Sequence, residues 1–149
     1  MLTVSIPKCT IIYNRTAKIY MAVNGQEVAR GTKQACQLAA LEHDALDIFD
    51  EVMAIIQNFP PAKERAIKAG FILRDGLLLP PQPFDVEGTY MNEIGRVGQH
   101  VVTWNNGFCS CDCHDFMLQN APILPSRQRA CKHILAVLIA SAMGDGQDE

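Results

Sequence analysis

Side chains that commonly bind metal ions crowd the last third of this 149-residue chain. They are Cys109, Cys111, Cys113, His114, Cys131 and His133. Thiolate sulfur and imidazole nitrogen are the usual donors of a structural zinc ion, which takes four of them in a tetrahedron. A Cys-x-Cys pair in a bent turn and the Cys131-x-His133 pair together supply such a set. Because the first run is Cys-x-Cys-x-Cys, its pair is either Cys109 with Cys111 or Cys111 with Cys113.

The spacing of the cysteines alone does not exclude other functions of the cluster. An iron–sulfur cluster suits four clustered cysteines but leaves His133 without a role. Cys109 is a candidate redox switch. A disulfide framework is disfavoured, because Cys9 and Cys36 stand alone as expected apolar fillers and the N-terminus does not resemble a secretory signal. A catalytic zinc is disfavoured as well, since three thiolates and one imidazole leave no position for water.

Two strands and a helix are predicted to position these ligand pairs. The strands cover residues 86–93 and 99–104, Asn105-Asn106-Gly107 is typical of a turn, and the helix covers residues 130–143. Residues two apart do not share a face of a regular helix. We therefore expect Cys131 at or before the cap of this helix and His133 in its first turn. The second half is predicted as strand, strand, zinc turn, loop and helix.

The second half resembles the SWIM zinc finger, whose signature is Cys-x-Cys, a variable loop and then Cys-x-His. The resemblance covers residues 90–140. An acidic and an aromatic residue often follow the first pair of this family, as Asp115 and Phe116 do here. The family also often continues its second pair as Cys-Lys-His-Ile-Leu-Ala, which residues 131–136 match at every position.

The resemblance also implies which residues bind the metal. The aromatic residue of the family usually lies three positions after its second cysteine, and Phe116 lies three positions after Cys113. One structural zinc ion is therefore expected, and its implied ligands are Cys111, Cys113, Cys131 and His133. Cys109 and His114 are alternative ligands, and each could bind the metal only in place of one of these four residues.

The first half is predicted as strand, strand and helix, and matches no family that we can name. Residues 10–23 and 26–30 form the strands of a hairpin at Asn24-Gly25. Thr32 is expected to cap a long helix over residues 33–58, and a short helix over 62–69 follows. A small hairpin is predicted over residues 71–79 around Asp75-Gly76. The fold class is α+β, with an N-terminal β-hairpin plus long helix followed by a small zinc-stabilised ββα module.

The proline-rich segment 80–85 is the predicted linker or crossover between two regions. The expected division is an α+β region at 1–79, the SWIM-type module at 86–144 and an acidic tail at 145–149.

Composition narrows the classes of function. Hydrophobic residues make up 48% of the chain and the net charge is −3, so the chain is globular and lacks the strong positive charge of a generic polyanion binder. The longest apolar stretch, residues 134–143, is about half of what a membrane span needs. An intracellular location, in the cytoplasm or with the nucleoid or nucleus, is expected. No phosphate-binding glycine loop or nucleophile elbow is present, and His43 and His100 are expected to be surface or hydrogen-bonded residues.

A basic cluster lies beside the metal ligands and is the candidate contact surface for nucleic acid or a partner. It consists of Arg127, Arg129 and Lys132. A weaker candidate is the set Lys63, Arg65 and Lys68 on the short helix. Proteins similar to this family include parts of Mutator-type transposases, modules beside Swi/Snf-type ATPases and accessory factors of recombinases.

The resemblance implies a non-enzymatic zinc-binding accessory protein in DNA transactions, acting through DNA or a DNA-bound partner. DNA binding would be weak and not sequence-specific. The alternative is a protein–protein adaptor that docks on a larger enzyme without touching DNA, and a third class is a catalytic domain in the first half. Neither a membrane nor a small-molecule substrate is expected as a partner.

Overall fold

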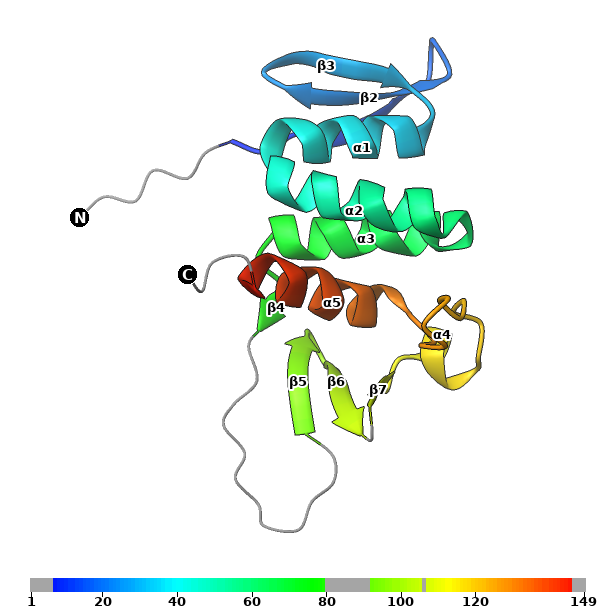
Figure 1. The fold of residues 1–149 in the computed structure, drawn as a ribbon. Coiled ribbons are helices and arrows are strands. Elements are labelled where there is room, and N and C mark those ends of the chain that lie inside the picture. Colours follow the sequence, from blue (N-terminus) through cyan, green and yellow to red (C-terminus); the bar gives the residue numbers. More distant parts are fainter. Residues whose placement is uncertain (1–6, 80–91, 106, 146–149) are drawn as a thin grey trace, which may run out of the picture. The chain divides into compact units, whose positions relative to one another are not determined.

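The computed structural model describes residues 7–79, 92–105 and 107–145. The chain divides into two compact units, residues 1–50 and residues 51–149 (Figure 1). The predicted linker at 80–85 lies outside the described residues, and the division drawn there from the sequence stays a prediction. Among the described residues, no helix has both the length and the apolar character that crossing a membrane requires.

The first unit is a three-stranded antiparallel sheet on which a helix packs. Thr32 caps this helix, because its hydroxyl oxygen accepts a hydrogen bond from the Ala35 N–H at 3.1 Å. The buried core consists of small and aliphatic side chains, among them Ala22, Cys36 and Leu41. The elements are β1 (Thr10–Asn14), β2 (Ile19–Asn24), β3 (Gln26–Gly31) and α1 (Lys33–Asp44).

The hairpin predicted at Asn24-Gly25 is confirmed, with Gly25 at φ +74°, but a second turn divides the predicted first strand into β1 and β2. Asn14 forms that turn: its side-chain oxygen accepts hydrogen bonds from the N–H groups of Thr16 and Ala17, both at 3.0 Å. The turn contains neither glycine nor proline, the residues that most clearly indicate a turn in a sequence, so the prediction missed it.

The single helix predicted over residues 33–58 is wrong at one point. Ala45, with φ −153° and ψ 74°, leaves the helical conformation and separates α1 from α2 (Leu46–Asn58). At the break, the Asp44 carboxylate accepts a hydrogen bond from the Cys9 N–H at 2.7 Å. This contact ties the end of α1 to a residue 35 positions away, which the helical periodicity of the segment does not show.

In the second unit, a long C-terminal helix lies between a helix and a four-stranded antiparallel sheet (Figure 1). Helix α5 packs on α3 through one side and on β5, β6 and β7 through the other. The apolar residues Ile67 of α3, Val102 of β6 and Ile134, Leu135 and Ile139 of α5 are buried. The elements are η1 (Pro60–Ala62), α3 (Lys63–Arg74), β4 (Leu78–Leu79), β5 (Asn92–Val97), β6 (His100–Asn105), β7 (Phe108–Cys111), α4 (His114–Met117) and α5 (Lys132–Asp145).

The hairpin predicted over residues 71–79 is wrong, because α3 continues to Arg74. Asp75-Gly76 ends this helix instead: Gly76 has φ +67°, its N–H donates to the Leu73 carbonyl, and the Leu77 N–H donates to the Ile72 carbonyl. These two bonds are the glycine-dependent ending that many helices adopt. An Asp-Gly pair suits this ending as well as a hairpin turn, so the local signal is ambiguous.

The strand predicted over residues 99–104 is confirmed as β6, whereas β5 overlaps the predicted strand 86–93 only at residues 92 and 93, and residues 86–91 lie outside the described residues. The zinc module also contains a strand that the predicted ββα form lacks, since β7 pairs with β6 and leads into the cysteine run. The mixed architecture is otherwise confirmed: an N-terminal sheet, then helices, then a C-terminal sheet and helix.

Candidate metal centre

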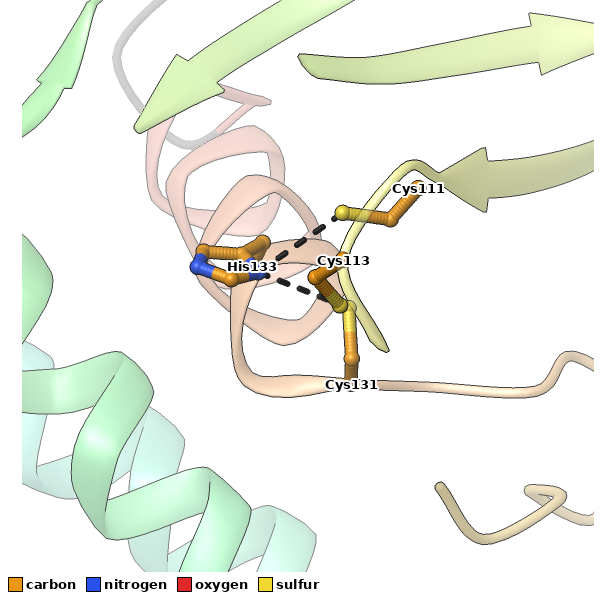
Figure 2. Close-up of side chains that lie close together, drawn as sticks. All are labelled: Cys111, Cys113, Cys131 and His133. Atoms are coloured by element: carbon orange, nitrogen blue, oxygen red, sulfur yellow. Dashed lines mark hydrogen bonds between the residues drawn. The ribbon is translucent and has the colours of Figure 1, made fainter. Parts of the chain in front are cut away.

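Four predicted ligands meet in the second unit. The ligand atoms of Cys111, Cys113, Cys131 and His133 all lie within 4.8 Å of one another, and all four residues are buried. Figure 2 shows their side chains pointing toward a common centre, with Nδ1 of His133 facing the sulfurs. Nδ1 lies 3.6 Å from the Cys111 sulfur and 3.9 Å from the Cys131 sulfur.

These separations fit a tetrahedral zinc ion. With Zn–S bonds of about 2.3 Å and Zn–N bonds of about 2.0–2.1 Å, a tetrahedron places sulfur and nitrogen about 3.6 Å apart. Three sulfurs and one nitrogen are also a usual donor set of structural zinc. The buried cluster is therefore consistent with one structural zinc ion, for which these four residues stay the predicted ligands.

A strand end, a short helix and the start of a long helix hold the ligands in place. Cys111 is the last residue of β7, and Cys113 immediately precedes α4. Cys131 precedes α5: its sulfur lies 3.5 Å from the Ile134 N–H and its carbonyl accepts from the Leu135 N–H at 2.9 Å. Cys131 thus caps α5, and His133 stands in the first turn, as the spacing predicts.

His133 is held from a second direction. The ring of His100, at the start of β6, stacks obliquely on the His133 ring with 4.8 Å between the ring centroids. Asp112, between two of the predicted ligands, lies with its Oδ1 3.3 Å from His100 Nδ1 and accepts a hydrogen bond from the Val101 N–H at 3.0 Å. Sheet and cysteine turn therefore fix the orientation of the imidazole together.

The three thiols of the cluster differ in proton affinity. A hydrogen bond from Cys111 lowers the pKa of Cys131 to about 4. The same bond raises the pKa of Cys111, and burial raises that of Cys113. Because zinc binds thiolates, Cys131 is ready to bind at neutral pH, whereas the other two thiols release protons on binding.

The two alternative ligands, Cys109 and His114, lie outside the cluster. Cys109 is buried on β7 but its sulfur is not among the atoms that converge, and burial raises its pKa. His114 is exposed at the start of α4. Both placements favour Cys111 with Cys113, and not Cys109 with Cys111, as the first ligand pair.

Arg65 supports the cluster, a role that the sequence does not reveal. Its guanidinium donates to both oxygens of Asp115 at 2.8 Å and to the Asn120 carbonyl at 3.2 Å. This pair joins α3 to α4 directly after the cysteine turn, and the hydrogen bonds from Arg65 lower the pKa of Asp115. Asp115 is the acidic residue noted in the SWIM resemblance, but sequence alone does not name its partner 50 positions earlier.

Gln128 and Arg129 organise the loop between the ligand pairs. The buried Gln128 amide accepts from the Cys109 N–H at 2.7 Å and donates to the Cys109 carbonyl at 2.8 Å. Arg129 donates to the carbonyls of Gln119 and Ala121 at 2.8 and 2.7 Å. In the sequence Gln128 stands between two arginines, and nothing there indicates its role.

The predicted contact residues therefore differ from one another. Arg127 is exposed with a positive φ of 70°, and Lys132 is exposed at the first position of α5. Arg129 is half-buried and its guanidinium holds the loop. Beside the cluster lies a cavity of about 390 Å³, lined on its charged side by Glu64, Arg65, Lys68, Asp115 and Lys132.

Comparison with known proteins agrees with this geometry. The SWIM zinc finger family matches residues 100–142, a stretch that contains the whole Cys/His cluster. No curated protein and no solved structure matches the chain. The C-terminal half of this chain therefore contains a SWIM zinc finger, a binding module, at residues 100–142.

Proposed function

We propose that this chain is a non-enzymatic accessory protein that acts in DNA transactions by contacting the nucleic-acid backbone with its SWIM zinc finger. The observation that carries the proposal is the exposure of two cations: Lys132, at the first position of α5, and Arg127, in the loop that leads to Cys131. Arginine and lysine side chains are the groups that commonly contact and neutralise the phosphates of nucleic acids.

The other cations near the metal centre already have anionic or carbonyl partners. Arg65 binds Asp115, Lys68 lies 2.9 Å from Glu64, and Arg129 donates to two backbone carbonyls. About two phosphate contacts, from Arg127 and Lys132, are therefore expected. Each neutralised phosphate adds about −0.9 to the slope of log affinity against log salt on duplex DNA, so the salt dependence should be shallow. Phosphate contacts carry no direct sequence information, and specificity should be low.

The test is a titration of single- and double-stranded DNA with zinc-loaded protein at low salt. The variant is Arg127→Asn with Lys132→Gln. Asparagine tolerates the positive φ of residue 127 better than alanine, and glutamine is a good helix residue. Arg129 is left intact because its loss would disturb the loop. We expect weaker binding and a salt slope smaller by about 1.8.

The matched control is Arg15→Ala with Lys33→Ala, which removes the same charge from exposed positions of the first unit. Control protein should bind like wild type. If control and variant lose the same affinity, net charge and not this surface governs binding. If wild type binds neither form of DNA at low salt, the direct DNA contact fails.

The alternative, a protein–protein adaptor, is favoured by a different observation. Large apolar side chains of the zinc module are exposed, namely Trp104, Phe108, Met117, Leu118 and Ile123. Exposed apolar side chains near a structured site suit protein contact better than phosphate contact when they form a patch. The net charge of −3 points the same way. Failure of wild type to bind DNA in the titration would leave this function as the proposal.

A further inference from the structure

A second group of metal-binding side chains lies in the first unit, far in sequence from the zinc finger. The Cys9 thiol, the His43 imidazole and the Asp44 carboxylate converge with their ligand atoms within 4.8 Å of one another. Nδ1 of His43 lies 3.6 Å from the Cys9 sulfur and 2.8 Å from Oδ1 of Asp44. Sulfur, nitrogen and oxygen donors thus surround one point.

Distant parts of the sequence build this group. Cys9 immediately precedes β1, whereas His43 and Asp44 are the last two residues of α1. The Cys9 N–H donates to Oδ2 of Asp44 at 2.7 Å and holds the thiol beside the helix end. Neighbouring residues of a regular helix point to different faces, so a convergence of His43 and Asp44 belongs to the end of a helix. The break at Ala45 provides that end.

The geometry does not suit a catalytic relay. In a nucleophile–histidine–acid triad, the nucleophile and the acid contact opposite nitrogens of the ring. Here the Cys9 sulfur and the Asp44 oxygen both face Nδ1. Donors on one side of the ring can share a cation but cannot pass a proton through the imidazole.

We propose that Cys9, His43 and Asp44 bind a second divalent cation of the zinc class. Thiolate, imidazole and carboxylate are all zinc ligands, and three protein ligands leave a further position for water. The sulfur–nitrogen separation of 3.6 Å already equals the edge of a tetrahedral zinc site. The nitrogen–oxygen separation of 2.8 Å has to widen by about 0.5 Å, since zinc–ligand bonds of about 2.0–2.2 Å set that edge near 3.3 Å.

The burial of the ligands and the dipole of α1 both favour a cation at this site. The side chain of Asp44 is 3% exposed and Cys9 is 3% exposed, whereas the His43 side chain is 47% exposed. The cation would thus have two buried ligands and one ligand on the solvent side, where it can enter and keep a water. It would also lie at the C-terminal end of α1, where the helix dipole favours positive charge.

The experiment separates this site from the zinc finger by order of loading. The full chain first receives one equivalent of zinc, and Co²⁺ is then added as a spectroscopic probe. We expect one equivalent of Co²⁺ to bind and to give a thiolate-to-cobalt charge-transfer band in the near ultraviolet. Cys9→Ser should abolish the band, and His43→Ala should weaken Co²⁺ binding by at least about tenfold, the loss known for mutations around metal ligands.

The control is Cys36→Ser, which changes another buried cysteine of the first unit that lies outside the group. It should keep both the band and the stoichiometry. His43 is half exposed, so His43→Ala is expected to keep the fold, which amide hydrogen exchange in α1 checks. The proposal is overturned if wild type gives no charge-transfer band, or if the band survives unchanged in Cys9→Ser and His43→Ala.

Discussion

Cys109 and Cys111 lie two apart on β7 and are both buried, yet only Cys111 reaches the metal centre. Residues two apart share a face of a strand, so alternation alone does not separate them. Position along the strand does: Cys111 ends β7 next to the turn that carries Cys113, while the backbone of Cys109 is clamped by Gln128. The position of Phe116 in the SWIM resemblance favours the same choice.

Serine substitution tests which of the two cysteines, Cys109 or Cys111, binds zinc. Cys109→Ser should keep one zinc per zinc finger and lower the free energy of unfolding by about 1–3 kcal/mol, because it places a hydroxyl in a buried position. Cys111→Ser should lose zinc to a chelator that leaves the wild type loaded. Native mass spectrometry of protein given one equivalent of zinc measures the zinc content of both variants. Zinc loss in Cys109→Ser with retention in Cys111→Ser would move the first ligand pair to Cys109.

Proton release on zinc binding follows from the pKa values of the thiols. At pH 8 Cys131, with its pKa near 4, is already a thiolate, whereas Cys111 and Cys113, with raised pKa values, carry protons. Zinc binding should therefore release two protons from these thiols, and affinity should rise with pH by about a hundredfold per unit. Calorimetry in buffers of different ionisation enthalpy counts the protons. A count of three would mean that Cys131 is protonated as well.

Among the secondary-structure elements, β5 approaches α5 closely at Gly95. A Cβ built there would lie 2.6 Å from Cγ2 of Val137 and 3.1 Å from Cδ1 of Leu78. Gly95→Ala should therefore destabilise the protein by about 1–3 kcal/mol through overpacking. Adding Val137→Ala should recover part of that loss, which a double-mutant cycle in urea measures.

Gly144→Ala is the matched control, because nothing lies within 4 Å of a Cβ at this position of α5. It should be neutral or stabilising by up to about 1 kcal/mol, the difference in helix propensity. A Gly95→Ala variant as stable as Gly144→Ala would contradict the close packing of α5 on the sheet.

Prediction from sequence succeeds for elements with local signals. The cap at Thr32, the turn at Asn24-Gly25 and the start of α5 after Cys131 each depend on a few neighbouring residues. The metal-binding pattern is local as well, since its two short pairs, Cys-x-Cys and Cys-x-His, are recognised through the resemblance to the SWIM zinc finger.

Elements whose bounds depend on contacts between residues far apart in the sequence cannot be predicted in this way. The break at Ala45 accompanies a hydrogen bond between Asp44 and Cys9, and the extension of α3 to Arg74 accompanies its packing on α5. Gln128 and Arg65 position the metal centre through partners 19 and 50 residues away. No periodicity carries such information, so the roles of these residues could not be predicted.

Across the whole molecule, the two units should depend on zinc to different degrees. The metal centre joins β7, α4 and α5, and α5 packs on α3 within the second unit. Structural zinc contributes free energy of folding to the elements that it joins, about 10–16 kcal/mol in isolated zinc-finger peptides. Its effect should thus extend from the ligands to α3 but not into the sheet of the first unit.

Hydrogen exchange before and after chelation tests this extent. Amides of α5 and α3 should exchange at least about tenfold faster without zinc, because exchange follows the local free energy of opening. Amides of β1–β3 should keep their rates. If α3 keeps its protection while α5 loses it, the border between independent regions lies near the segment 80–85. Equal loss in both units would mean one cooperative domain.

The SWIM zinc finger of this chain should hold its structural zinc ion through three sulfurs and one nitrogen. X-ray absorption at the zinc edge, on protein loaded with one equivalent of zinc, is the decisive test. We expect three sulfur neighbours at about 2.3 Å and one nitrogen at about 2.0–2.1 Å. His133→Cys should convert this signal to four sulfurs. Four sulfurs in the wild type would mean that Cys109 replaces His133, and a shell with fewer than three sulfurs would contradict the ligand set altogether.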